Sequence, residues 1–307
     1  MSTVDPARAS RLALAGMLAN VVLAAVKIIA GVLGHSSALI ADGIESVADI
    51  VGSAVIWGGL RVASLPRSER HPYGFGKAEA LAAVVVAIMI IAAAGFIAAD
   101  AVGEIRRPGP APAGFTLVVL IVVIVVKEGL FRLVRRAARD TASSAVRTDA
   151  WHHRVDAITS LAALVGISLT LLAGKGWESA EDWAALLAAC IIAFNGLSLL
   201  LPPLRELLDA QALDVVDVVT RHAAAVPGVV RVQKAYARRS GRELWIDMHI
   251  WVEGTMNVHD AHTLAHAVKD AVRAGVPAVR DVLIHIEPAP AAGPASGAAD
   301  SGPEAYT

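Results

Sequence analysis

The chain has 307 residues, of which 56% are hydrophobic, and its formal net charge at pH 7 is -1. Soluble domains are about 45–50% apolar, so this composition, with a mean hydropathy of +0.59, indicates an integral membrane protein. The near-zero charge excludes the basic surface of a nucleic-acid-binding protein, and the single cysteine, Cys190, excludes a disulfide or a cysteine zinc site within one chain.

Six apolar segments are long enough to cross a bilayer, which takes about 20 residues. They are 12–33, 38–60, 79–99, 115–134, 154–173 and 182–201. The polar start of the chain leads into the first segment without a small-residue cleavage site, so we expect a cytoplasmic leader and not a cleaved signal peptide. Arginine and lysine gather before the first segment and in the loops after the second and fourth. The positive-inside rule therefore predicts a multi-pass protein of the inner (plasma) membrane with both termini cytoplasmic.

The second segment contains three acids, Asp42, Glu45 and Asp49. On insertion scales each ionisable side chain costs about 2.5–3.5 kcal/mol at the centre of a membrane helix, so three together require a function. Their spacing of three and four residues places them on one helical face. This face predicts a site for a cation inside the membrane.

The fifth segment begins with the run DAWHHRVDAITS, in which His152 and Asp156 also share a helical face. With Glu45 and Asp49 they can form two facing pairs. Imidazole and carboxylate ligands in fours are ordinary for zinc. Protons can replace a departing metal on the same groups, so the movement of metal can be coupled to a counter-movement of protons.

Two questions about these spans stay open at this point. The simpler interpretation is that these polar groups only pack the helices together. Two pairs of possible ligands, Glu45 with Asp49 and His152 with Asp156, lie on separate spans and favour a metal site. Asp42 shares the face of Glu45 and Asp49 and lies a turn away from them, so its role as a ligand is undecided. His153 points in another direction from His152 and is expected at the membrane interface.

Hydropathy falls after Pro202 and Pro203, and the pattern there is that of a water-soluble domain. It predicts a helix over 214–225, strands over 228–237 and 243–253, a helix over 257–274 and a strand over 279–287. The predicted fold class is an all-α membrane domain of six helices (1–205) followed by a cytoplasmic α+β domain (206–288) with the order α-β-β-α-β. The remaining residues, 289–307, are rich in Pro, Ala, Gly and Ser and are expected to be disordered.

Alternation along the last two strands separates an apolar face from a polar one. The helices can cover the apolar faces. The other faces carry His249, His285 and Glu287 together with aromatic residues suited to an interface. His259, His262 and His266 follow one side of the second helix, and solvated histidines are the expected interpretation for the first and last of these.

Five motifs together resemble the cation diffusion facilitator family. They are SSALIADGIESVADI, HPYGFGKAEALAA, DAWHHRVDAITS, DMHIWVEGTMNVHDAH and DVLIHIEP. The resemblance covers residues 11 to 288 and implies a homodimeric antiporter that exports Zn²⁺ or a related metal from the cytosol in exchange for protons. It implies a transport site of Glu45, Asp49, His152 and Asp156. It also implies a cytoplasmic metal site of His249, His262, His285 and Glu287 at or near the dimer contact, in a domain similar to metallochaperones.

The sequence departs from the family pattern at several positions. Glu45 stands where relatives often have Asp or His, which leaves the metal open: zinc is expected as substrate and regulator, and Fe²⁺, Mn²⁺, Co²⁺ or Cd²⁺ would suit the same ligands. Some relatives have a further site between spans two and three; here Ser68 and Phe75 replace two of its ligands, so only His71 remains and that site is predicted to be lost. The resemblance also implies a charge link between Lys77 and Asp209.

Two other classes of protein could use such residues. One is a metal-binding sensor or scaffold in the membrane that supports no flux, and the other is an intramembrane metallo-enzyme. Against the enzyme, no HExxH motif or nucleophile arrangement accompanies the predicted site, and four protein ligands leave no position for a substrate water. Flux of metal into vesicles separates the transporter from both.

Overall fold

The computed structural model describes residues 6–107, 109–141, 160–161, 163–172, 177 and 179–290. It divides the chain into two compact units, one of Met1–Val62 with Leu81–Leu204 and one of Ala63–Ala80 with Arg205–Thr307. The loop between the second and third predicted spans therefore belongs with the C-terminal residues, which the predicted division at residue 205 does not anticipate.

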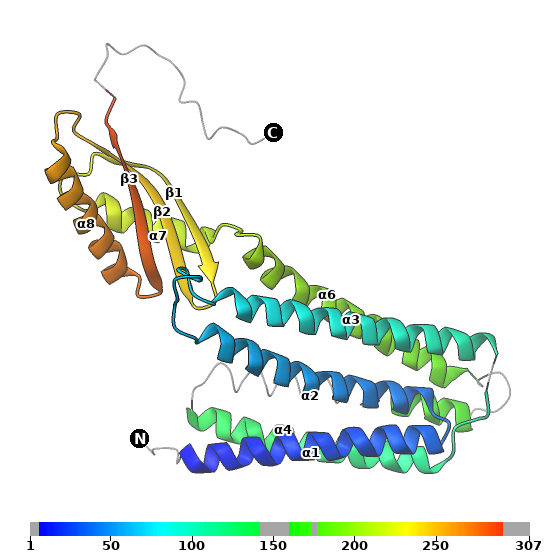
Figure 1. Ribbon diagram of the computed structural model, residues 1–307. Coiled ribbons are helices and arrows are strands. Elements are labelled where there is room, and N and C mark those ends of the chain that lie inside the picture. Colours follow the sequence, from blue (N-terminus) through cyan, green and yellow to red (C-terminus); the bar gives the residue numbers. More distant parts are fainter. Residues whose placement is uncertain are drawn as a thin grey trace. The chain divides into compact units, whose positions relative to one another are not determined.

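The described part of the first unit consists of helices and their connections, and five of the helices are 27 to 30 residues long. These are α1 (Pro6–Leu33), α2 (Ser37–Ala63), α3 (Lys77–Arg106), α4 (Phe115–Thr141) and α6 (Ala180–Leu207), and α1 and α4 lie side by side (Figure 1). At 1.5 Å per residue each is about 40 Å long, enough for the bilayer core of about 30 Å. By length and composition, α3 and α6 are apolar enough to cross a membrane. Of the predicted fifth span, the helix Ala163–Leu172 is described.

Glycines allow α1 and α2 to pack closely. A Cβ atom on Gly43 would lie 2.6 Å from Cγ1 of Ile28, and one on Gly31 would lie 2.9 Å from the backbone nitrogen of Ile40. In lipid the hydrophobic effect does not drive helices together, so their association depends on van der Waals packing. Small residues favour this packing because they let the two backbones approach closely. The close approach of the two helices also brings Lys27 of α1 within 2.7 Å of Asp42 on α2.

The second unit consists of α7 (Leu213–Ala224), β1 (Arg231–Ser240), β2 (Glu243–Val252), α8 (Val258–Gly275) and β3 (Val279–Pro288). The strand order is β1-β2-β3, with β1 antiparallel and β3 parallel to the central β2. Gly241, with φ +60°, provides the left-handed position in the tight β1–β2 turn. The predicted fold class, a helical membrane domain followed by an α-β-β-α-β domain, is confirmed.

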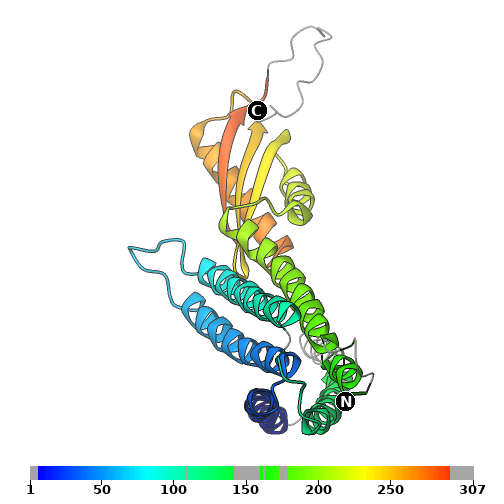
Figure 2. The same ribbon diagram turned by 90° about the vertical axis from the view of Figure 1, so that its right-hand side faces the viewer.

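The two helices of this unit cover the same face of the sheet (Figure 2). Buried residues alternate along β2 and include Ile246, Met248 and Ile250, which pack against Val219 of α7 and Val268 of α8 in one core. Side chains at the intervening positions of β2 therefore lie on the opposite face, which neither helix covers. This uncovered face carries the predicted cytoplasmic ligands.

The glycine packing gives a testable expectation. Gly43→Ala should lower the thermal stability of the purified protein, because overpacking a tight contact costs roughly 1–3 kcal/mol. Gly58→Ala is the matched control on the same helix, because a Cβ at Gly58 would meet nothing within 4 Å. Thermal unfolding of both variants in detergent measures the difference. Equal midpoints for the two would contradict the close packing of α1 and α2.

Candidate metal sites

The predicted transport site is described in part. Glu45 and Asp49 lie one turn apart on α2, and both are half-buried. Glu45 lines a small pocket whose described walls, besides Asp42, are apolar residues of α2, the helix Ala163–Leu172 and α6. His152 and Asp156 lie outside the described residues, so their ligand role stays a prediction.

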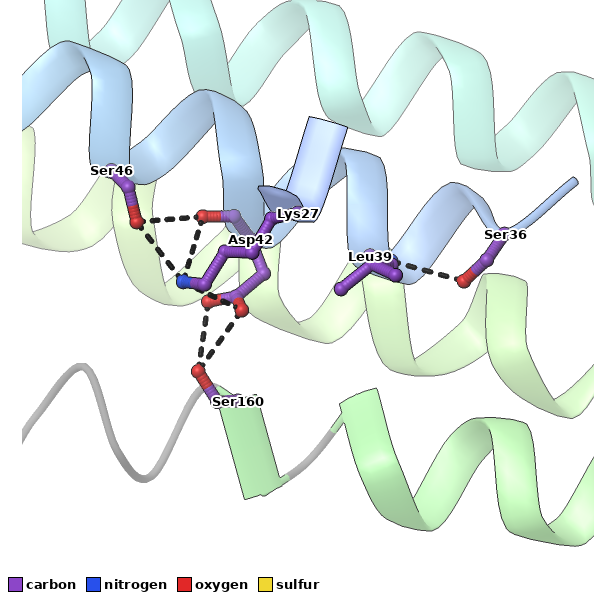
Figure 3. A network of polar contacts seen from close by, with 6 residues as sticks. All are labelled: Lys27, Ser36, Leu39, Asp42, Ser46 and Ser160. Atoms are coloured by element: carbon purple, nitrogen blue, oxygen red, sulfur yellow. Dashed lines mark hydrogen bonds and ion pairs between the residues drawn. The ribbon is translucent and has the colours of Figure 1, made fainter. Parts of the chain in front are cut away.

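Asp42, undecided from sequence, is held in a network of buried polar groups (Figure 3). Its Oδ2 atom lies 2.7 Å from the ammonium Nζ of Lys27 on α1, and these side chains are 3% and 0% exposed. The hydroxyl of Ser160 donates to Asp42 Oδ1 at 2.9 Å and Oδ2 at 3.0 Å. The carboxylate therefore connects α1, α2 and the fifth predicted span.

Lys27 and Ser160 were not singled out by the sequence analysis. A lysine in the middle of the apolar run VVLAAVKIIAGVL was the available signal for Lys27, because a charge at that depth needs a partner. Ser160 gave no signal, because serine hydroxyls in helices often bond to a carbonyl of their own helix.

A second group of acids lies where α2 and α6 begin. Glu181 and Asp182, both buried, accept hydrogen bonds from the hydroxyls of Ser36 at 2.5 Å and Ser37 at 2.7 Å. Glu181 also accepts from the backbone N–H of Ala38 at 3.2 Å, which satisfies a free donor in the first turn of α2. These bonds fix the first turns of α2 and α6 beside each other.

In the second unit, the structure brings together three of the four predicted cytoplasmic ligands. Possible ligand atoms of His249, His285 and Glu287 all lie within 4.8 Å of one another. The parallel register pairs His249 on β2 with His285 on β3, and their ring centroids are 4.8 Å apart. Two imidazoles and a carboxylate on an uncovered sheet face could hold a divalent transition metal and leave a position for a further ligand.

Two hydrogen bonds favour the ionised form of Glu287, which is the form that binds metal. His249 Nδ1 lies 2.6 Å from Oε1 of Glu287, and Trp251 Nε1 donates to Oε2 at 3.1 Å. These two bonds hold the pKa of the Glu287 carboxyl below its usual value, the bond with His249 contributing most. Trp251 is thus a supporting residue of this cluster, a role that the sequence analysis did not assign to it.

The fourth predicted ligand, His262, lies elsewhere in a single chain. It is exposed on α8, where its ring centroid is 4.6 Å from that of His266. Because α8 covers the opposite face of the sheet, the fold does not bring His262 to the cluster within one chain. Its ligand role stays a prediction that would require a second copy.

Two expectations concern the loop of the second unit. His71 stacks on Phe75, with ring centroids 4.4 Å apart, and its backbone N–H bonds to Ser68. These are the residues that replace the ligands of some relatives. Lys77 Nζ and Asp209 Oδ1 form the expected ion pair at 2.8 Å, and each side chain is 42% exposed, so the pair contributes at most about 1 kcal/mol to stability.

Comparison with known proteins supports both units. Residues 13–208 match the family model described as the cation efflux transmembrane domain, and residues 213–289 match the cytoplasmic domain of cation efflux proteins. The cation-efflux pump FieF of Klebsiella pneumoniae is 30% identical over 91% of this chain and 92% of its own. The manganese efflux system protein MneP of Bacillus subtilis is 27% identical over 91% of this chain and 95% of its own.

Two further matches differ more in extent. Metal tolerance protein C1 of Arabidopsis thaliana is 33% identical over 89% of this chain, which spans 61% of that protein. Among solved structures, a C-terminal domain of MamM is 30% identical over 24% of this chain and 92% of its own, with a TM-score of 0.23. The family matches confirm the resemblance carried by the sequence motifs.

The support of Glu287 by Trp251 can be tested without removing a ligand. The background is the full-length protein with Asp49→Asn, which removes a ligand of the predicted transport site so that zinc binding reports on the cytoplasmic cluster. In this background Trp251→Phe should weaken zinc binding about tenfold, because ligands that lose a supporting hydrogen bond typically bind metal 10–100-fold more weakly. Trp245→Phe is the matched control on the same strand, since Trp245 Nε1 has no hydrogen-bond partner among the described residues. Equilibrium zinc titration measures both, and equal affinities would contradict the supporting role.

Proposed function

The chain belongs to the cation efflux family, and we propose that it exports Zn²⁺, or a related divalent transition metal, from the cytosol in exchange for protons. At the level of the family it is a divalent metal cation efflux transporter of the membrane with a cytoplasmic C-terminal domain, and it is not an enzyme. We propose three points beyond the family: which metal is transported, that protons are exchanged for it, and which residues bind it.

The observation that carries this proposal is the pair of half-buried carboxylates on one face of α2. Glu45 and Asp49 lie in a helix long enough to span the bilayer, where ionised groups are costly unless matched by a partner. A metal ion with its positive charges matches them in one state and protons match them in the other. Alternating between the two states exchanges metal for protons.

The remaining ligands of the proposed transport site are His152 and Asp156. Asp156 precedes Ser160 by four residues, and the Ser160 hydroxyl is hydrogen-bonded to Asp42 of α2. This contact supports a fifth span that lies against α2. In a helix, residues four apart share a face, so the same contact favours Asp156 facing Glu45 and Asp49.

The chemistry of the proposed ligands favours zinc without excluding its neighbours. One imidazole and three carboxylates form a comparatively hard set that also suits Mn²⁺, Fe²⁺, Co²⁺ and Cd²⁺. The relative MneP is named for manganese, so manganese is the strongest competitor. Uptake assays with each metal separately decide between them.

We further propose that the chain is a homodimer with both termini cytoplasmic, and that metal at the cytoplasmic cluster regulates transport. The uncovered sheet face with His249, His285 and Glu287 supports this, because a second copy could cover it and complete the coordination with His262. If metal binds one arrangement of the two subunits more tightly than another, it increases the population of that arrangement. The size of the shift is set by the difference between the two affinities.

Loss of the proposed ligands should abolish transport. Asp49→Asn combined with Asp156→Asn should remove zinc flux into proteoliposomes while the protein remains folded, because two of four ligands are lost. Glu128→Gln is the matched control, since this α4 carboxylate bonds to Arg132 in its own helix at 2.7 Å. Wild-type flux in the double variant would overturn the site. Metal binding without flux in the unaltered protein would favour the sensor or scaffold.

The exchange with protons predicts a response to pH on one side of the membrane. Acidifying the compartment that receives the metal should speed zinc transport, because protons there take the place of the departing ion on imidazole and carboxylate groups. The measurement is zinc uptake into vesicles with the membrane potential clamped. A rate that is independent of the pH gradient would contradict antiport.

A further inference from the structure

Lys27 lies deep in the helical unit and all three of its donors have acceptors. The ammonium Nζ lies 2.7 Å from Asp42 Oδ2, 3.0 Å from the hydroxyl of Ser46 and 3.4 Å from the backbone carbonyl of Asp42 (Figure 3). Ser46 in turn donates to the same carbonyl at 3.1 Å. A lysine ammonium has three donors, so the group is saturated by α2.

Asp42 is also held from a second helical segment. The Ser160 hydroxyl bonds to both of its carboxylate oxygens, and Lys27 occupies the second. Lys127 of α4 is 4% exposed and lies close enough to Lys27 for their charges to interact. Asp42 is therefore paired with the Lys27 ammonium, whose positive charge raises the electrostatic cost of bringing a divalent ion to this carboxylate.

The hydrogen bonds at the helix starts give the network its place along the membrane axis. The first turns of α2 and α6 are joined through Ser36 with Glu181 and Ser37 with Asp182. α6 leads from this end to the cytoplasmic domain, so the start of α2 lies at the extracytoplasmic end. At 1.5 Å per residue, Asp42 is then about 4.5 Å closer to that end than Glu45.

The pocket beside Glu45 lies on this same side. Its walls come from the early turns of α2 and α6, among them Ala38, Ala41 and Ala185, with Asp42 and Glu45 as its described ionisable groups. A metal ion that leaves Glu45 towards the extracytoplasmic side would therefore pass Asp42. A free carboxylate at that point would be a fifth ligand on the route of release.

We propose that Lys27 is a positioning residue for metal export: with Ser160 it holds Asp42 out of metal coordination, so that the ion released from Glu45 and Asp49 is not captured on its way out. This inference rests on the proposed export function. The tethered ammonium supplies the charge that Asp42 needs and cannot leave with the substrate. Asp42 is thus an acid of the α2 face that does not bind the transported ion.

Removing the Lys27 ammonium should strengthen zinc binding and slow turnover. Lys27→Met frees Asp42 to bind metal, so the KM for zinc should fall and the turnover rate should fall at least about tenfold, within the range of coupling for groups in one hydrogen-bonded network. The double variant Lys27→Met with Asp42→Asn removes both the ammonium and the carboxylate that would capture the departing ion. Its turnover should return to within about threefold of wild type. Such a rescue would show that the effects of the two changes are coupled, because the effects of changes at independent sites add.

The experiment is zinc uptake by the full-length protein in proteoliposomes, with kinetics and equilibrium zinc binding measured for each variant. Because a buried methionine could disturb folding, two milder variants accompany it. Lys27→Arg keeps the charge and should keep the turnover within about threefold of wild type. Ser160→Ala should lower both KM and turnover, whereas Ser198→Ala, whose hydroxyl bonds to the Phe194 carbonyl of its own helix, should change neither.

Failure of this inference differs from failure of the proposed function. If the unaltered protein does not exchange zinc for protons, the proposed function is wrong and this inference with it. If the unaltered protein transports and Asp42→Asn alone removes zinc binding at the membrane site, Asp42 is a ligand and the inference is wrong. It is also wrong if Ser160→Ala matches Ser198→Ala, or if the folded double variant is as slow as Lys27→Met.

Discussion

A carboxylate inside a membrane helix has to be matched by a cation or a proton, because the hydrocarbon core does not solvate a free charge. α2 carries three such groups on one face, and this constraint organises the helical unit around them. Asp42 is matched by the tethered ammonium of Lys27 on α1. In our proposal Glu45 and Asp49 bind metal in one state and protons in the other, and this exchange makes them part of the transport site.

In the cytoplasmic domain the need to match a charged group with a partner is weaker. Water solvates the uncovered sheet face, so His249, His285 and Glu287 can be half-exposed without a metal. Their organisation comes from the parallel register of β2 and β3 and from the bonds that His249 and Trp251 make with Glu287. A cluster in water can bind and release metal at moderate cost, which suits regulation better than translocation.

Sequence reasoning was most successful where one helix or strand contains the whole pattern. The acids of α2 and the alternating strands are periodic, so their faces followed directly from spacing. It was incomplete where contacts join distant segments: Lys27 is 15 residues from Asp42, and Ser160 is 118 residues from it. The grouping of the 63–80 loop with the second unit and the place of His262 on α8 are tertiary facts of the same kind, which local patterns do not contain.

The central claim is that metal and protons compete for the carboxylates of α2, and proton release on metal binding tests it most directly. The full-length protein with His249→Ala and His285→Ala, which removes the cytoplasmic cluster, would be titrated with zinc in weak buffer containing a pH indicator. We predict that protons are released as zinc binds, more of them at mildly acidic than at neutral pH, and that Asp49→Asn suppresses both binding and release. Zinc binding of equal affinity at both pH values, without proton release, would contradict the account.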